Sequence, residues 1–176
     1  MALTGADAVS PAAADLFDHG GIRRSAVLDS QWWRLVSGVL LHGNLQHLFL
    51  SVFVLYLSGL IFLMVADNKT FFLVFWLAAL IGGSVGLMSQ ENVVTVTPTA
   101  GILGVTGAYL SLFIARKLYS FEAGLALPMI LMGLAFGLYP WVDHFANIGG
   151  LIAGLLTGFV LQRTGRLAVL DDDQDP

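Results

Sequence analysis

GILGVTG at residues 101–107 and GLIAGLLTG at residues 150–158 place small residues at regular intervals in two apolar stretches. The glycines recur every third residue in the first stretch and every fourth in the second, so each set lies along one face of a helix. In lipid, small residues at such spacing let two helix backbones approach closely, which is a main source of packing energy. We therefore predict that these two helices pack tightly against each other.

The composition predicts an integral membrane protein. Of the 176 residues, 57% are hydrophobic and only 11% are charged, and the mean hydropathy is +0.81. An ordinary soluble domain has about 25% charged residues. A helix that crosses a bilayer needs about 17–25 predominantly apolar residues. Windows of about that length without a charged residue or histidine occur at 48–65, 70–88, 100–115, 123–138 and 145–161. The sequence thus predicts an all-α, polytopic transmembrane bundle with about five spans.

Three segments follow from this pattern. Residues 1–41 are predicted to lie outside the membrane, with a break at Gly20-Gly21 and a short interfacial helix beginning near the paired tryptophans Trp32-Trp33. Residues 42–162 form the predicted transmembrane core. Residues 163–176 form an acidic, solvated tail.

The positive charges predict an orientation in the membrane. If successive polar connections alternate between the two sides, one side receives Lys69, Arg116, Lys117, Arg163 and Arg166. The other side receives Arg23, Arg24 and Arg34. Because cytoplasmic loops carry the excess of Lys and Arg, this distribution predicts a cytoplasmic carboxy terminus.

Several chemistries are excluded or disfavoured. The chain has no cysteine, which excludes disulfides, thiolate metal sites and a cysteine nucleophile. Its four histidines are not accompanied by Asp or Glu at metal-ligand spacing, so we predict no metal site. No polybasic patch suggests a nucleic-acid partner, and no cofactor is implied.

Four motifs resemble those of the rhomboid intramembrane serine proteases, peptidase family S54. They are Trp33-Arg34, the pair His42 and His47 that leads into an apolar window, the glycine run at 101–109, and Ala146-Asn147-Ile148-Gly149-Gly150. The resemblance covers roughly residues 3–162 and implies a rhomboid-like helical bundle. The family core has six spans. We therefore expect that the family's first span is missing here and is supplied by an upstream helix or by a partner.

The resemblance also implies where a catalytic site would lie. Aligning residues 104–109 with the family's helix without gaps puts Thr99 at the serine nucleophile, and Asn147 stands at the histidine base. His47, Ser51 and Ala100 fall in the oxyanion region, where Ser51 replaces an asparagine. A second register would instead make Thr106 the hydroxyl.

Asn147 is the decisive substitution. A serine or threonine hydroxyl must give its proton to an adjacent base during attack, and an asparagine amide cannot accept that proton near neutral pH. A hydrogen bond from Asn147 to Thr99 would join two helices without activating the hydroxyl. We therefore predict an inactive site. The alternative base is His144, three residues earlier, in a relocated dyad with Thr99; the competing interpretation is an exposed histidine.

These inferences lead to one main hypothesis about function and two alternatives. The main hypothesis is a catalytically inactive pseudoprotease that binds transmembrane helices of client proteins, a role implied by the resemblance alone. The first alternative is an active rhomboid-type serine/threonine endopeptidase that cleaves transmembrane substrates. The second is a structural subunit of a membrane complex, beside a partner that supplies the missing span. All three place a multi-pass protein in a lipid bilayer, and we predict a bacterial inner membrane.

Overall fold

The computed structural model describes residues 11–88, 93–115, 131 and 143–167. Within these ranges the regular elements are all helices, apart from one isolated antiparallel bridge between Ile22 and Thr95. The helices are α2 Ala13–Asp18, α3 Arg24–Leu28, α4 Arg34–Leu40, α5 Leu45–Phe62, α6 Asn68–Gly86, α7 Pro98–Ile114 and α9 His144–Arg163.

The four longest of these helices coincide with four of the windows predicted from the sequence. α5, α6 and α9 are each long and apolar enough to cross a membrane, and α7 is an apolar helix of 17 residues. The prediction of an all-α membrane bundle is therefore confirmed. The window 123–138 lies outside the described residues, apart from Leu131.

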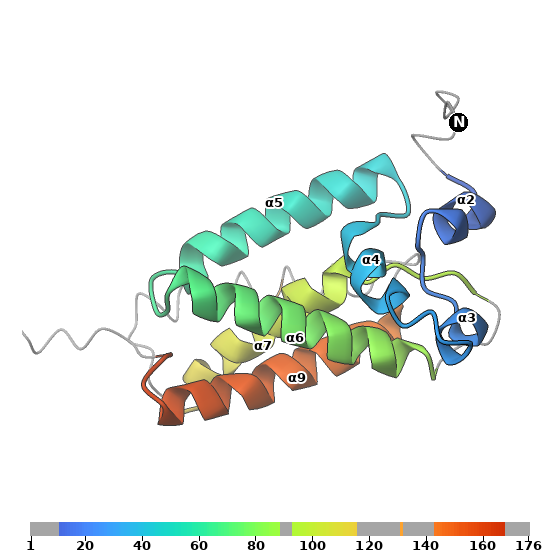
Figure 1. Ribbon diagram of the computed structural model, residues 1–176. Helices are drawn as coiled ribbons and strands as arrows, with labels where there is room; N and C mark the ends of the chain where they lie inside the picture. Colours follow the sequence, from blue (N-terminus) through green and yellow to red (C-terminus); the bar gives the residue numbers. More distant parts are fainter. Residues whose placement is uncertain (1–10, 89–92, 116–130, 132–142, 168–176) are drawn as a thin grey trace, which may run out of the picture.

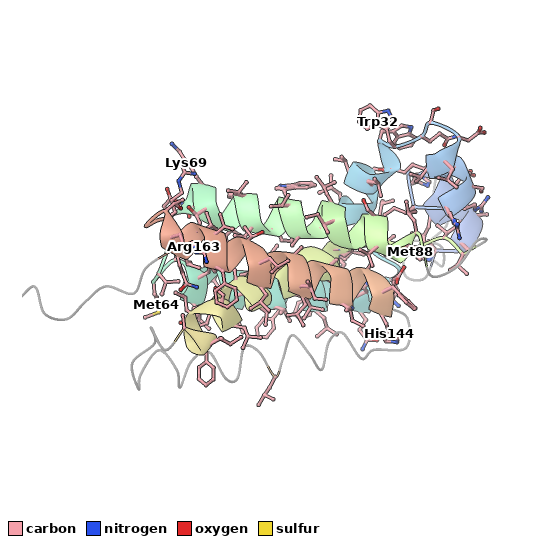
Figure 2. All side chains as sticks on the ribbon, turned by 90° about the horizontal axis from the view of Figure 1, so that it is seen from below. Trp32, Met64, Lys69, Met88, His144 and Arg163 are labelled. Carbon is pink, nitrogen blue, oxygen red and sulfur yellow. The ribbon has the colours of Figure 1, made fainter. Side chains whose placement is uncertain are left out.

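The long helices run side by side, and the short ones gather at one end of the bundle (Figure 1). Figure 2 shows Met64, Lys69 and Arg163 at one end and Trp32, Met88 and His144 at the other. In the described part of the segment before α5, from residue 11 on, the helices α2, α3 and α4 are short and lie at the end where α9 begins.

The ends of the helices follow from local side-chain chemistry. Asn44, Asp67 and Asp143 precede α5, α6 and α9, and each accepts a hydrogen bond from a backbone N–H in the first turn. α7 instead begins with Pro98, whose fixed φ suits the first helical position. Proline lacks the backbone N–H, but at this position an N–H would have no partner within the helix. The predicted break at Gly20 is confirmed by its φ of 108°, a left-handed conformation that favours glycine.

Backbone contacts hold α7 against α9, as the glycine spacing predicted. A Cβ added at Gly154 would overlap the carbonyl oxygen of Gly104, and one added at Gly150 would overlap that of Ala100. Further along, Gly158 lies against Ala108. The partners advance together along both helices, so α7 and α9 run parallel and begin at the same end of the bundle.

α6 packs against both of these helices through small residues. Gly82 lies against Ala100 and against the carbonyl oxygen of Ala146, while Gly149 of α9 lies against Val85. The core around them is apolar and includes Val74, Ile102, Val105, Ala108 and Leu112. The three helices α6, α7 and α9 therefore form one close-packed unit.

Arg34 organises the amino-terminal segment. Its side chain is only 6% exposed, and Nη1 donates to the carbonyl oxygens of Phe17 at 2.6 Å and Gly21 at 3.0 Å. Nε donates to Gln31 at 2.7 Å, and the guanidinium carbon lies 3.9 Å from the centroid of the Phe17 ring. The neighbouring Trp33 is 45% exposed. In the Trp-Arg motif the arginine is therefore buried in the protein, whereas the tryptophan is exposed at its surface.

The same segment reaches the start of α7. Ile22 and Thr95 exchange backbone hydrogen bonds at 2.9 and 2.8 Å, and the N–H of Thr97 donates to the carbonyl oxygen of Gly38 at 2.9 Å. Gly38 itself is packed against Ile22. These contacts fix the chain immediately before Pro98, so they set where α7 begins.

Replacing Gly154 with alanine is expected to destabilise the bundle, because the new methyl group would push α7 and α9 apart. Overpacking of this kind costs about 1–3 kcal/mol. The matched control is Gly59→Ala in α5, where the new Cβ would meet the Phe71 ring at an ordinary 3.5 Å. Thermal unfolding in detergent measures both variants. Equal midpoints would contradict the close contact of α7 and α9.

Replacing Arg34 with methionine is expected to loosen residues 11–40, because three hydrogen bonds of a buried guanidinium are lost. A hydrogen bond to a charged group contributes about 1.5–3 kcal/mol, and about 1.4 kcal/mol is a factor of ten. Cleavage beside Phe17 by a protease specific for aromatic residues should therefore accelerate about tenfold or more. The exposed Arg163→Met is the control and should leave the rate unchanged.

Candidate functional site

Thr99 and Asn147 lie at the starts of the two helices that are in backbone contact. Thr99 is the second residue of α7 and 1% exposed, and Asn147 is the fourth residue of α9 and 3% exposed. Ala100, the residue after Thr99, lies against Gly150, three residues after Asn147. Because residues three apart share a helix face, Asn147 faces α7 one turn before that contact. The fold brings both predicted positions to one interface.

Neither side chain has a hydrogen-bond partner within the described part of the chain. Thr99 Oγ1 and the Oδ1 and Nδ2 atoms of Asn147 are all buried and unsatisfied there. The hydrogen bond expected between the two residues is therefore absent. A buried donor or acceptor without a partner costs about 1–3 kcal/mol, so this arrangement is costly for the fold.

Thr106, the hydroxyl of the second register, is engaged within its own helix. It is fully buried, and Oγ1 donates to the carbonyl oxygen of Ile102, four residues earlier, at 3.2 Å. This back-bonding is usual for threonine inside a helix and needs no partner on another helix. The geometry gives Thr106 a structural role in α7.

His144 lies at the end of the bundle, outside the buried interface. It is the first residue of α9 and is exposed, whereas Thr99 is buried and has no hydrogen bond to any described residue. Asp143 accepts a hydrogen bond from the N–H of Ala146 at 3.0 Å and thereby caps the helix. The relocated dyad of His144 and Thr99 is not formed.

His42 and His47 pack against each other at the start of α5. Their ring centroids lie 5.3 Å apart in an edge-on arrangement, and burial lowers the pKa of His42. His47 lies in the first turn of the helix, and its Nδ1 accepts from the N–H of Gly43 at 3.3 Å. In the neutral imidazole, which has one donor and one acceptor, this hydrogen bond corresponds to the tautomer with the proton on Nε2.

Ser51 follows His47 by one turn and belongs to the inner face of α5. That face consists of Ser51, Val54, Ser58 and Phe62. The hydroxyls of both serines are buried and have no hydrogen-bond partner among the described residues. Ser51 and His47 thus share one side of the helix, while Ala100 of the predicted oxyanion region is packed between α6 and α9.

Two further residues, Thr97 and Ser58, have buried hydroxyls, unsatisfied among the described residues, that were not predicted from the sequence. Thr97, just before α7, is 1% exposed and faces Gly83 of α6, and Ser58 is fully buried. Oγ1 of Thr97, like the Ser58 hydroxyl, lacks a partner within the described residues. The alternation of threonines at positions 95, 97 and 99 could have pointed to Thr97. A lone serine within a span, such as Ser58, gives no such indication in the sequence.

The described residues therefore bring hydroxyl and carboxamide groups together, which donate and accept hydrogen bonds, and none of them places a base in hydrogen-bond contact with Thr99 Oγ1. The residues that the structure describes contain no cluster of three or more His, Cys, Asp or Glu side chains that could hold a metal ion.

Comparisons with known proteins agree on one family. The family model described as "Rhomboid domain" matches residues 29–164. RHOMBOID-like protein 4 of Arabidopsis thaliana is 31% identical over 163 residues, which are 87% of this chain and 40% of that protein. No solved structure matches the chain.

Two other relatives carry contrasting names. Inactive RHOMBOID-like protein 8 of Arabidopsis thaliana is 29% identical over 155 residues, which are 82% of this chain and 43% of that protein. Rhomboid protease GluP of Bacillus subtilis (strain 168) is 28% identical over 149 residues, or 83% of this chain and 29% of that protein. The chain spans less than half the length of each of these three relatives.

Cysteine labelling tests the burial of Thr99 against the exposure of His144. Because the chain has no cysteine, Thr99→Cys and His144→Cys each carry a single thiol. We expect the thiol at position 99 to react with a small maleimide about 100-fold more slowly, since local opening must precede reaction and each factor of ten needs about 1.4 kcal/mol. Similar rates for both thiols would contradict the buried site.

Proposed function

The chain belongs to the rhomboid family, and from that premise we propose that it is a catalytically inactive member that binds transmembrane segments of client proteins. It is an integral membrane protein built on the family's helical scaffold. The observation that carries the proposal is the buried carboxamide of Asn147, which makes no hydrogen bond to Thr99 and which we assign to the position of the family's base.

The lack of a base argues against proteolysis. General-base assistance is typically worth a factor of about 10²–10⁴, and a site that loses its base keeps only the residual catalysis of binding and oxyanion donors. His144 is exposed and makes no hydrogen bond to Thr99. His42 and His47 belong to α5 and the turn before it, where His47 is bonded to Gly43.

Overall similarity does not choose between an active and an inactive member. A relative named inactive and a relative named a protease are 29% and 28% identical to the chain, respectively. The type of residue at position 147 is therefore stronger evidence about activity than the percentage of identical residues. A scaffold that keeps the close contact of α7 and α9 while losing the base favours binding over cleavage.

We further propose a cytoplasmic carboxy terminus. Lys69 and Arg163 lie together at one end of the bundle in Figure 2, away from Trp32. A cytoplasmic location of the positive charges at that end agrees with the positive-inside bias. The bacterial inner membrane stays a prediction, because the relatives named above come from a plant and from a bacterium.

Cleavage of a generic transmembrane reporter in proteoliposomes tests the proposal. We expect no cleavage by the natural chain and cleavage by the triple variant Ser51→Asn, Thr99→Ser and Asn147→His. Restoring a base alone should raise the rate about 10²–10⁴-fold above any residual activity. Thr106→Val in the triple variant is the matched control and should preserve activity.

Cleavage by the natural chain that Thr99→Ala abolishes would refute inactivity and establish the threonine endopeptidase instead. Stable copurification of one fixed partner, with no client binding, would favour the structural subunit. A family protease in the same vesicles verifies that the reporter can be cleaved.

A further inference from the structure

We propose that Thr99 and Asn147 form a hydrogen-bonding site for an uncharged polar side chain within the client's transmembrane helix, an amide or a hydroxyl. This inference rests on the proposed function and names the class of client that the binding protein selects. It follows from the side chains at the interface of α7 and α9 and from the packing of α5.

The site consists of polar atoms that are buried and unused. Asn147 has an amide that donates and a carbonyl that accepts, and the hydroxyls of Thr99 and Thr97 can do both. All of these atoms are buried and have no hydrogen-bond partner among the described residues. Folded proteins satisfy about 90% or more of such groups, so the unsatisfied Thr99 and Asn147, in the first turns of two helices in backbone contact, are candidates for hydrogen bonds to a ligand.

The surroundings of the site favour an uncharged ligand. α7 contains no Asp, Glu, Lys, Arg or His, and in α9 these residue types occur only at the ends, as His144 and Arg163, with Asp143 just before the helix, where its carboxylate accepts the N–H of Ala146. A buried charge without an opposite charge nearby is strongly destabilising. A carboxamide or hydroxyl of the client would instead gain donors and acceptors that lipid cannot provide.

α5 is the helix best placed to admit a client. Of the α5 span 28% is buried, against 50% for α6 and 44% for α9. Figure 1 shows α5 slanting away from α6 toward the end that carries α4. Val54 and Phe62 of its inner face belong to the same core cluster as Val105 of α7, so α5 covers α7.

The contact surface of α5 is also weaker than that between α7 and α9. Two of its four inward residues, Ser51 and Ser58, have buried hydroxyls without a partner in the described chain. Such hydroxyls reduce the gain from burial, because each costs free energy that an apolar group would not. We therefore place the entry of the client helix at α5, which has fewer buried apolar side chains facing the bundle than α6 or α9.

A pair of client peptides tests the inference. One is a poly-leucine transmembrane peptide with a single central asparagine, and the other has leucine there. Binding is measured in vesicles of phosphatidylcholine and phosphatidylglycerol. The readout is energy transfer between a dye on Arg163→Cys, an exposed position, and a second dye on the peptide. We expect the asparagine peptide to bind about tenfold more tightly, as a hydrogen bond of about 1–2 kcal/mol between membrane helices allows.

The double variant Thr99→Val and Asn147→Leu should lose this preference and still bind the leucine peptide. Thr106→Val is the control, because its hydroxyl is bonded within α7, and it should keep the preference. Equal binding of both peptides by the natural chain, or a preference that survives the double variant, would overturn the site but not the proposed function. Binding of neither peptide would overturn both.

Thermal unfolding without peptide distinguishes a ligand site from a site already filled by water. If the buried groups are unsatisfied in the free protein, their apolar replacements should leave the midpoint unchanged or raise it. A lower midpoint, both for the double variant and for Thr99→Val alone, would mean that water already satisfies them, and it would overturn the inference.

Discussion

The contact between the backbones of α7 and α9 is the constraint on which the rest of this structure depends. Lipid gives helices little hydrophobic reason to associate, so association relies on close packing. Gly150 and Gly154 supply it by letting the carbonyl oxygens of Ala100 and Gly104 approach the facing helix directly. The same contact sets the register of the two helices, and so it holds the first turns that carry Thr99 and Asn147 together.

This arrangement separates the scaffold from the chemistry of the site. The register depends on glycines, whereas proton transfer would depend on the single side chain at position 147. The carboxamide of Asn147 is therefore accommodated without loss of the helix contact, although it gains no hydrogen bond to Thr99. The unsatisfied groups lower stability, and retaining such groups is understandable where binding requires them.

A second, more distant set of contacts positions the same site. Arg34 ties Phe17 and Gly21 together, and the chain after Gly21 pairs with Thr95 just ahead of α7. The amino-terminal segment thus does more than rest at the membrane surface. It fixes the approach to Pro98, while α5, with its two unsatisfied serines, is less buried than α6 and α9.

The sequence by itself determined the membrane class, four of the described helices, the α7–α9 contact and the break at Gly20, while the missing base at Asn147 stays a prediction. These features depend on composition, on periodicity within one helix or on the chemistry of one residue, all of which are local. The window 123–138 and the acidic tail stay predictions. Only the tertiary structure decided the burial of Arg34, the unsatisfied Thr97 and Ser58, the exposure of His144 and the absence of a bond between Thr99 and Asn147. These depend on distances between segments far apart in the chain, and a hydrogen bond is made or lost over less than an ångström.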